Sequence, residues 1–319
     1  MTRFDVTTIG EGQLRYCVPA GTRLEQARQF DVYVTGTEAN VACLLSRLGW
    51  RAGWVSALPD NPLGRRVINE YRLAGLDTSA VRWMEGGRLA TYYVEFAVPP
   101  RSTQVFFDRQ NTCFTTLTPA DIDWDYLLDT RLLHLSGLTV PLSPSVGAVV
   151  REALQRAKAA GIPVSFDVNY RERLWTPEQA GVALAPFVRQ VDLLFCGRSD
   201  AQRLFGCSGS PEEIIQGLAR WTDAAQIVTT LSADGVIGWD RQQFIHVPAR
   251  EVVILDRVGA GDALVGGVLH GWLGGDFARG LRCGALTAAM ALSVYGDQVY
   301  TSADELETLL DAPWTDIRR

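Results

Sequence analysis

Lysine is almost missing from this sequence, and its scarcity excludes two kinds of chemistry. The single lysine, Lys158, lies in a segment whose alternating polar and apolar residues are typical of a solvated helix face. A Walker-type phosphate loop needs Gly-Lys-Ser/Thr, and a Schiff-base mechanism needs a lysine amine. If the chain binds phosphate, it must therefore hold it with backbone N–H groups and arginine.

Cysteine and histidine are also few, and neither is clustered. The six cysteines are scattered without a Cys-x-x-Cys pair, at Cys17, Cys43, Cys113, Cys196, Cys207 and Cys283. This spacing favours reduced, buried thiols over a zinc site or a disulfide framework. The three histidines occur singly in strand-like or helical surroundings, at His134, His246 and His270. The sequence therefore offers neither a Cys/His metal site nor a Ser-His-Asp triad.

Long runs of charged or apolar residues are absent as well. The formal net charge is −6 and no run of like charges occurs, so we expect no nucleic acid partner. No apolar stretch reaches the roughly 18 residues that a membrane span needs, and residues 1–10 lack the pattern of a signal peptide. We therefore expect a soluble, cytoplasmic protein without a membrane partner.

What the sequence does contain is a regular alternation of predicted strands and helices. Strands are predicted at 6–10, 52–57, 132–136, 164–167, 191–195, 226–231, 236–239 and 244–247, with helices at 37–48, 62–74, 143–160, 177–189 and towards 310. This pattern predicts one α/β domain over residues 1–319, with a doubly wound, mostly parallel sheet and helices on both faces. Residues 12–35 and 81–113 carry short alternating runs with aromatics, which predict a small inserted β-sheet.

The stretch from Ile254 to Gly267 joins apolar β-branched residues to a predicted helix through a glycine turn. Asp256 precedes the turn at 259–261, and Asp262 opens the helix. The first N–H groups of a helix lack internal partners and carry partial positive charge, so this turn can hold an anion. A carboxylate beside it suggests a hydroxyl activated next to a phosphoryl group. An ordinary turn with Asp262 as helix N-cap would produce the same pattern.

Polar residues follow three of the predicted strands. They are Gly36, Thr37 and Asn40 after the strand ending near 34, Asp108 and Arg109 after an insert strand, and Asp167, Asn169 and Arg171 after the strand at 164–166. Ligands of open α/β sheets bind at the carboxyl ends of strands, so these side chains are expected on one face. A helix-entry turn at Gly36 and Asx-turn roles for Asp167 and Asn169 are the structural alternatives.

Two of these segments carry a family resemblance. Gly36-Thr-Glu-Ala-Asn-Val-Ala42 and Asp256-x-x-Gly-Ala-Gly-Asp262 are similar to the two signatures of the ribokinase-like (PfkB-type) carbohydrate kinase superfamily, which the chain resembles over essentially its full length. Residues 133–139, 167–171 and 191–195 are most similar to 2-keto-3-deoxygluconate kinases. The resemblance implies a ribokinase-like α/β fold whose small β-sheet is a lid over the site.

The resemblance also implies roles in catalysis. Asp262 would accept the proton of the attacking sugar hydroxyl, and the N–H groups of Gly259, Ala260 and Gly261 would form the anion hole. Such phosphoryl transfer depends mainly on positioning and charge stabilisation. The phosphoryl donor would be ATP with Mg²⁺.

The resemblance further implies a pocket for a sugar acid. Arg109 and Arg171 match positions that clamp the substrate carboxylate, for which the planar fork of arginine is suited. The other implied pocket residues are Gly36, Thr37, Asn40, Tyr93, Asp167 and Asn169. Surface salt bridges are the alternative for both arginines. The aromatics at 92–96 serve a dimer face as readily as a pocket wall, and we expect a homo-oligomer through the lid sheet.

The nucleotide and metal surroundings depart from the family pattern. Thr230, Ser232 and Gly235, with Gly259 and Gly261, match the nucleotide-binding positions, but Ser232 stands where glycine is usual. A backbone that needs positive φ at this point would be strained by serine. Ala285 stands near the adenine pocket where asparagine is frequent.

The metal positions depart as well. The metal-associated Asn-x-x-Glu motif is replaced by residues 197–200, so Gly197 stands in the place of asparagine and Asp200 is the expected Mg²⁺ residue. Asp256 is the expected ligand of a monovalent cation.

The sequence thus predicts an ATP-dependent carbohydrate kinase acting on 2-keto-3-deoxygluconate. A kinase of another small sugar such as fructose is the alternative within this class, in which Arg109 and Arg171 would face no carboxylate. A sugar-acid-binding protein with weak or lost kinase activity is the alternative outside it, because Gly197 and Ser232 depart from the kinase pattern.

Overall fold

The computed structural model describes residues 2–96 and 99–311, and its largest element is a nine-stranded sheet. In spatial order its strands are β13 (Phe244–Val247), β12 (Val236–Trp239), β11 (Gln226–Thr230), β10 (Leu193–Phe195), β9 (Val164–Asp167), β8 (Leu133–Ser136), β1 (Val6–Ile9), β4 (Ala52–Pro59) and β5 (Val81–Met84). The pairs from β5 to β11 are parallel, whereas β12 and β13 add antiparallel strands at one edge. This architecture confirms the predicted doubly wound, mostly parallel sheet.

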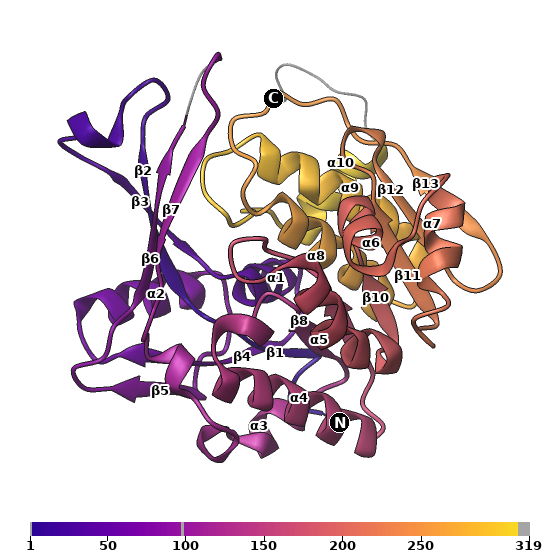
Figure 1. Ribbon diagram of the computed structural model, residues 1–319, viewed down its shortest axis with the longest axis horizontal. Coiled ribbons are helices and arrows are strands. Elements are labelled where there is room, and N and C mark those ends of the chain that lie inside the picture. Colours follow the sequence, from indigo (N-terminus) through magenta and orange to yellow (C-terminus); the bar gives the residue numbers. More distant parts are fainter. Residues whose placement is uncertain (1, 97–98, 312–319) are drawn as a thin grey trace.

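Helices cover both faces of this sheet. They are α1 (Thr37–Arg47), α2 (Pro62–Leu73), α3 (Trp124–Leu128), α4 (Pro144–Ala159), α5 (Pro177–Gln190), α6 (Arg198–Phe205), α7 (Pro211–Leu218), α8 (Ala260–Leu273), α9 (Phe277–Leu292) and α10 (Ala303–Asp311). Helices α3 to α7 pack on one face, and α1, α2, α8 and α9 pack on the other (Figure 1). None of the helices in the described part of the chain is long and apolar enough to cross a membrane.

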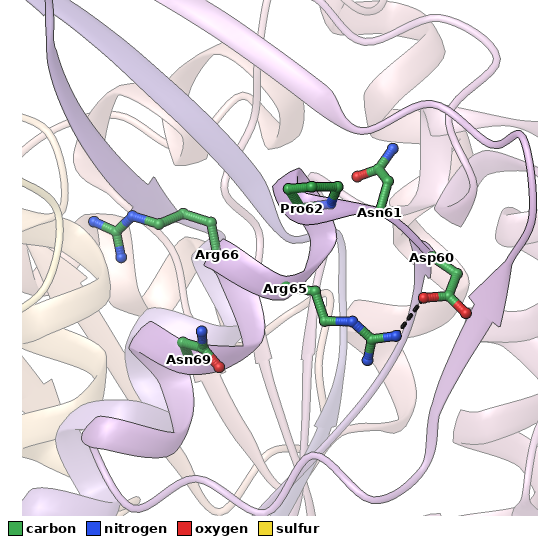
Figure 2. A pocket seen from close by; sticks show the side chains of 6 residues that line it. All are labelled: Asp60, Asn61, Pro62, Arg65, Arg66 and Asn69. Atoms are coloured by element: carbon green, nitrogen blue, oxygen red, sulfur yellow. Dashed lines mark hydrogen bonds and ion pairs between the residues drawn. The ribbon is translucent and has the colours of Figure 1, made fainter.

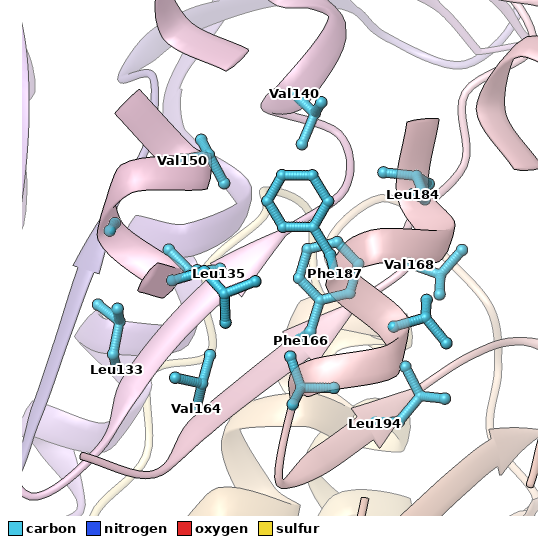
Figure 3. Packing of buried hydrophobic residues seen from close by; sticks show 14 of the residues in the cluster. Leu133, Leu135, Val140, Val150, Val164, Phe166, Val168, Leu184, Phe187 and Leu194 are labelled. Atoms are coloured by element: carbon cyan, nitrogen blue, oxygen red, sulfur yellow. The ribbon is translucent and has the colours of Figure 1, made fainter. Parts of the chain in front are cut away.

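Alternation along the strands explains these two apolar layers. Leu194 points to the layer formed with α4 and α5, whereas Leu193 and Phe195 point to the layer formed with α1 and α8. Figure 3 shows the first layer, where Phe166 of β9 stacks on Phe187 of α5 with 5.5 Å between ring centroids. Both faces of the central strands are therefore buried, as a parallel sheet requires.

A second, four-stranded sheet, here called the lid, has the order β3-β2-β6-β7. Its strands are β2 (Gln13–Val18), β3 (Asp31–Thr35), β6 (Ala90–Glu95) and β7 (Gln104–Asp108), and Figure 1 shows it standing beside the C-terminal half of the protein. The predicted insert at 81–113 began too early, because β5 pairs with β4 in the main sheet and only β6 and β7 belong to the lid. Residues 97–98 of that insert lie outside the described part.

Candidate active site

The glycine turn at 259–261 forms the N-terminus of α8, as the sequence predicted. Gly259 is the N-cap residue with φ +88°, and a Cβ there would lie 2.4 Å from the carbonyl oxygen of Asp297, so only glycine fits. The first intrahelical bond runs from Ala263 N to Gly259 O, which leaves the preceding N–H groups at the turn available. A Cβ at Gly261 would meet no atom within 4 Å, so this turn borders open space.

Asp262 lies in the first turn of α8 and is 7% exposed. Its Oδ2 accepts a hydrogen bond of 2.8 Å from Nδ2 of Asn40, which comes from α1. Burial raises the pKa of Asp262 to about 7, while Asn40, Arg171 and Thr37 lower it. The structure therefore brings four predicted site residues together around this carboxyl group.

Two further carboxyl groups share this region. Asp167 ends β9, and burial together with the negative charges of Asp262 and Asp200 raises its pKa to about 8. Asp200, in the first turn of α6, accepts the backbone N–H of Tyr170 at 3.2 Å, and burial raises its pKa. Arg171 is exposed and opposes the shift of both carboxyls. Three carboxyl groups therefore lie near one another at this end of the sheet, and burial disfavours their ionised forms unless a cation compensates for the charge.

Asp167 makes the predicted Asx-type turn, because its carboxyl group accepts the backbone N–H of Asn169. The φ of Asn169 is +41°, and its backbone hydrogen bond lowers the pKa of Asp167. Asparagine tolerates this left-handed backbone because its short side chain can bond locally. The turn at Asp167 and Asn169 is therefore present, and it does not exclude these residues from the site.

The two predicted arginines have different surroundings. Arg109 is bound to Glu11, whose Oε2 accepts from Nε at 3.1 Å and from Nη2 at 2.7 Å. Glu11 is 3% exposed and also accepts the hydroxyl of Thr112 at 2.5 Å. Arg109 is thus part of a nearly buried ion pair, whereas Arg171 remains at the surface of the site.

The first turn of α1 contributes more to this region than the sequence indicated. Gly36 is its N-cap residue, and a Cβ there would lie 2.5 Å from the carbonyl oxygen of Glu11. Glu38 is buried, accepts the hydroxyl of Thr139, and has its pKa raised to about 7 by burial. Glu38 was not among the predicted site residues, although a glutamate beside Thr37, just before the apolar run of the helix, could have indicated it.

Tyr93 does not lie where the resemblance placed it. Cross-strand pairing puts Tyr93 opposite Tyr16 and Phe106, and its ring stacks on Tyr16 at 5.3 Å. Its neighbour Tyr92 faces the body instead and donates a hydrogen bond of 2.9 Å to Oδ2 of Asp297. Side chains alternate between the two faces of a strand, so Tyr92 and not Tyr93 lies on the face of the lid that is turned toward the body.

One of the predicted nucleotide residues, Gly235, packs against the segment that lines a pocket. Ser232 has φ +58° in the 3-10 turn Ser232–Asp234 and Gly235 has φ +98°, so serine does occupy a left-handed position. A Cβ at Gly235 would lie 2.1 Å from the carbonyl oxygen of Val247. Val247 in turn lines a pocket of about 490 Å³ between the segment after β13 and α9, and Ala285 also borders it. A pocket therefore lies beside Ala285, where the resemblance implies the adenine, and adenine binding there stays a prediction.

Another hollow, at the N-terminus of α2, is separate from these residues. Figure 2 shows it lined by Asp60, Asn61, Pro62, Arg65, Arg66 and Asn69. Arg65 pairs with Asp60 and Arg66 with Glu70, so both guanidinium groups are already neutralised. None of its lining residues is a predicted site residue, and we assign it no function.

Histidine and cysteine behave as structural residues. Nδ1 of His134 lies 2.9 Å from the hydroxyl of Ser165, and complete burial lowers the pKa of His134 to about 3. All six cysteines are free and buried. No group of three or more His, Cys, Asp or Glu side chains within residues 2–96 and 99–311 is arranged to hold a metal ion.

A helix N-terminus beside a buried carboxyl group, with a separate pocket between the segment after β13 and α9, fits a phosphotransferase in which a hydroxyl is the acceptor. Residues 5–304 match the pfkB family of carbohydrate kinases, and the chain belongs to that family. It is a sugar kinase of the ribokinase-like fold.

Three relatives illustrate the similarity. A 2-dehydro-3-deoxygalactonokinase of Haloferax volcanii is 36% identical over 307 residues, covering 96% of each chain. The crystal structure of a 2-dehydro-3-deoxygluconokinase from Thermotoga maritima superposes with a TM-score of 0.91 at 32% identity, covering 97% of this chain and 100% of the other. A ribokinase II from E. coli, solved with ATP and Mg²⁺, has a TM-score of 0.87 at 22% identity and coverage of 96% and 98%. The last comparison supports the fold alone.

Proposed function

We propose that this carbohydrate kinase transfers the γ-phosphoryl group of ATP to a hydroxyl of a 2-keto-3-deoxy sugar acid, with 2-keto-3-deoxygluconate as the first candidate. The observation that carries the proposal is the Asn40–Asp262 hydrogen bond at the N-terminus of α8, with the charge of Arg171 acting on the same carboxyl group. The similarity to the T. maritima 2-dehydro-3-deoxygluconokinase supports the choice of substrate.

Asp262 is the proposed general base. Asn40 fixes one carboxylate oxygen, so the other is directed to the sugar hydroxyl. As the hydroxyl oxygen bonds to the γ-phosphorus, its proton moves to Asp262 and the bond to the ADP oxygen breaks. The N–H groups of Gly259, Ala260 and Gly261 stabilise the negative charge on the transferring group.

Arg171 is the proposed partner of the substrate carboxylate. It is exposed at the end of β9 and close enough to influence Asp167, Asp200 and Asp262. Arg109 is paired with Glu11, so it would bind the substrate carboxylate only after releasing Glu11. Otherwise its role would be to hold Glu11 in place. The remaining proposed sugar contacts are Gly36, Thr37, Asn40, Asp167 and Asn169. Tyr93 is not among them, because it lies on the other face of the lid.

Thr230, Ser232 and Gly235 are the proposed phosphate-side contacts of ATP, and the pocket beside Ala285 would take the base. Asp167 and Asp200 suit Mg²⁺, because a bound cation would offset the cost of ionising two carboxyl groups whose pKa values burial raises. Asp200 would hold the ion, directly or through water, and the ion would neutralise charge on the donor phosphates.

A phosphorylation assay tests the substrate. ATP turnover is measured with 2-keto-3-deoxygluconate, with 2-keto-3-deoxygalactonate and with fructose. The galactonate form is the second candidate because the H. volcanii relative is named for it. Preference for fructose would refute the sugar-acid assignment, and binding of a sugar acid without turnover would refute the kinase assignment in favour of a binding protein.

We also propose a homodimer formed through the lid. The lid face opposite Tyr92 exposes Val32, Phe30 and Phe106 beside Tyr16 and Tyr93, an aromatic surface that suits a second copy. Phe106→Glu should shift the protein towards the monomer in analytical ultracentrifugation. The free, buried cysteines accord with a reducing cytoplasm, in which we place the protein.

A further inference from the structure

An arginine from the lid is buried next to the anion hole. The side chain of Arg15, on β2, is 0% exposed and lies between two carboxylates. Its Nη2 is 2.5 Å from Oδ2 of Asp256, and its Nη1 is 2.6 Å from Oδ1 of Asp297. Burying a charge of this kind is costly unless partners compensate for it, and here two opposite charges do so.

The two carboxylates have their other bonds satisfied by the chain. Oδ1 of Asp256 accepts the N–H of Val258 at 3.0 Å, and Oδ2 accepts that of Gly296 at 3.3 Å. Oδ2 of Asp297 accepts the hydroxyls of Thr35 at 2.5 Å and Tyr92 at 2.9 Å. A metal cation at Asp256 would have to displace these donors and would face the positive charge of Arg15, so the residues present do not fit one.

This cluster also supports the anion hole. Val258, which Asp256 holds, directly precedes the N-cap residue Gly259. The backbone of Asp297 packs against Gly259 closely enough to leave no room for a Cβ. The two segments that frame the turn, before α8 and after α9, are therefore joined through one guanidinium group.

We propose that Arg15 takes the place of a monovalent cation at Asp256, so that this kinase works without added K⁺ or Na⁺. The inference rests on the proposed kinase function. Arg15 is a positioning residue: it touches neither sugar nor nucleotide, but holds the 256–259 segment in the conformation that aims the anion-hole N–H groups. Arg15 lies on β2 of the lid, so the positive charge that holds the 256–259 segment is supplied by the lid.

The first test uses the unmodified protein. Its turnover is measured in tetramethylammonium chloride, and then with KCl or NaCl replacing that salt at constant ionic strength. The expected result is the same kcat in all three salts. Stimulation by K⁺ or Na⁺ would overturn the proposal, and this arm does not depend on the folding of any variant.

The second test removes the guanidinium. Arg15→Ala should lower kcat about tenfold or more, since loss of one anion-hole donor costs on the order of a hundredfold. KCl or guanidinium chloride should restore part of the rate, whereas the bulkier tetramethylammonium should not. A folded variant with unchanged kcat, or one that no cation restores, would overturn the replacement of a cation by Arg15.

A matched control and a second readout complete the design. Arg51→Ala removes a guanidinium that pairs with Asp5 outside the site, and it should leave kcat and the salt response unchanged. Thermal unfolding in KCl against tetramethylammonium chloride should show a K⁺-dependent Tm for Arg15→Ala only, because a bound ion stabilises the folded state. If no sugar is turned over in any salt, the kinase function fails, while this Tm comparison still decides the role of Arg15.

Discussion

The body side and the lid side of the site are built in different ways. On the body side, Asn40 and Asp262 come from the first turns of two helices and meet as a direct hydrogen bond. On the lid side, Arg15, Tyr92 and Arg109 each bind a carboxylate of the protein itself. The body therefore supplies the proposed reacting group, Asp262, whereas the lid supplies charges and hydroxyls that bind carboxylates around it.

Loss of the proposed base should have the largest effect and would test the body side directly. Asp262→Asn keeps the size of the side chain but removes the proton acceptor, so kcat should fall by about two to four orders of magnitude. Sugar binding, measured by calorimetry, should stay close to that of the unmodified protein. Normal turnover in this variant would refute the role of Asp262 as the base, and an N-cap role is not open to it because Gly259 caps α8.

The two arginines separate body from lid in substrate binding. Arg171→Lys should raise KM for the sugar acid roughly tenfold or more, about 1.4 kcal/mol, because a point charge does not replace the planar fork. Arg109→Lys should have a smaller effect on KM, since Arg109 is held by Glu11. Steady-state kinetics of both variants measure the contrast. A larger effect at Arg109 would show that the lid exchanges Glu11 for the substrate.

The pH profile probes the charge state of the body side. Burial raises the pKa of Asp262 to about 7, and the base must be ionised, so kcat/KM should rise as pH increases through about 7. Asn40 lowers this pKa through its hydrogen bond. Asn40→Ala should therefore move the rise to higher pH. An unmoved profile would mean that another group controls it.

The raised pKa of Asp262 also makes the stability of the protein depend on pH. The pKa of Asp262 is raised in the folded state, so folding binds a proton that the unfolded chain releases from about pH 4 upward. This group thus lowers the free energy of unfolding as pH increases from about 4 to about 7. Asp262→Asn should remove that part of the pH dependence, which chemical denaturation at several pH values measures.

The smallest effects are expected on stability, at the neighbouring lid residues Tyr92 and Tyr93. Tyr92→Phe removes the hydrogen bond to Asp297 and should lower the free energy of unfolding by about 1 kcal/mol. Tyr93→Phe should leave it nearly unchanged, because the ring can still stack on Tyr16. Urea unfolding of the two variants compares them, and equal losses would contradict the assignment of faces.

The fold was predictable because its signals are local and repeated. Strand β10 at Leu193–Phe195 lies within its predicted bounds of 191–195, since a buried strand in a parallel sheet reads as a short apolar run. Helix α8 begins at Ala260 because Gly259, with φ +88°, lies outside the right-handed helical region. The segment at Val81–Met84 was placed in the wrong sheet, because alternation shows that a strand exists but not which edge it joins.

The sequence by itself determined the order of elements, the lack of a lysine-based phosphate loop and the glycine turn that opens α8. Only the tertiary structure decided that Arg15 lies between Asp256 and Asp297, that Arg109 binds Glu11 and that Tyr92 rather than Tyr93 faces the body. Backbone conformation follows from neighbouring residues, but the partners and pKa of a side chain depend on burial and on charges from distant parts of the chain. The charge pattern around Asp262 therefore became visible only after folding.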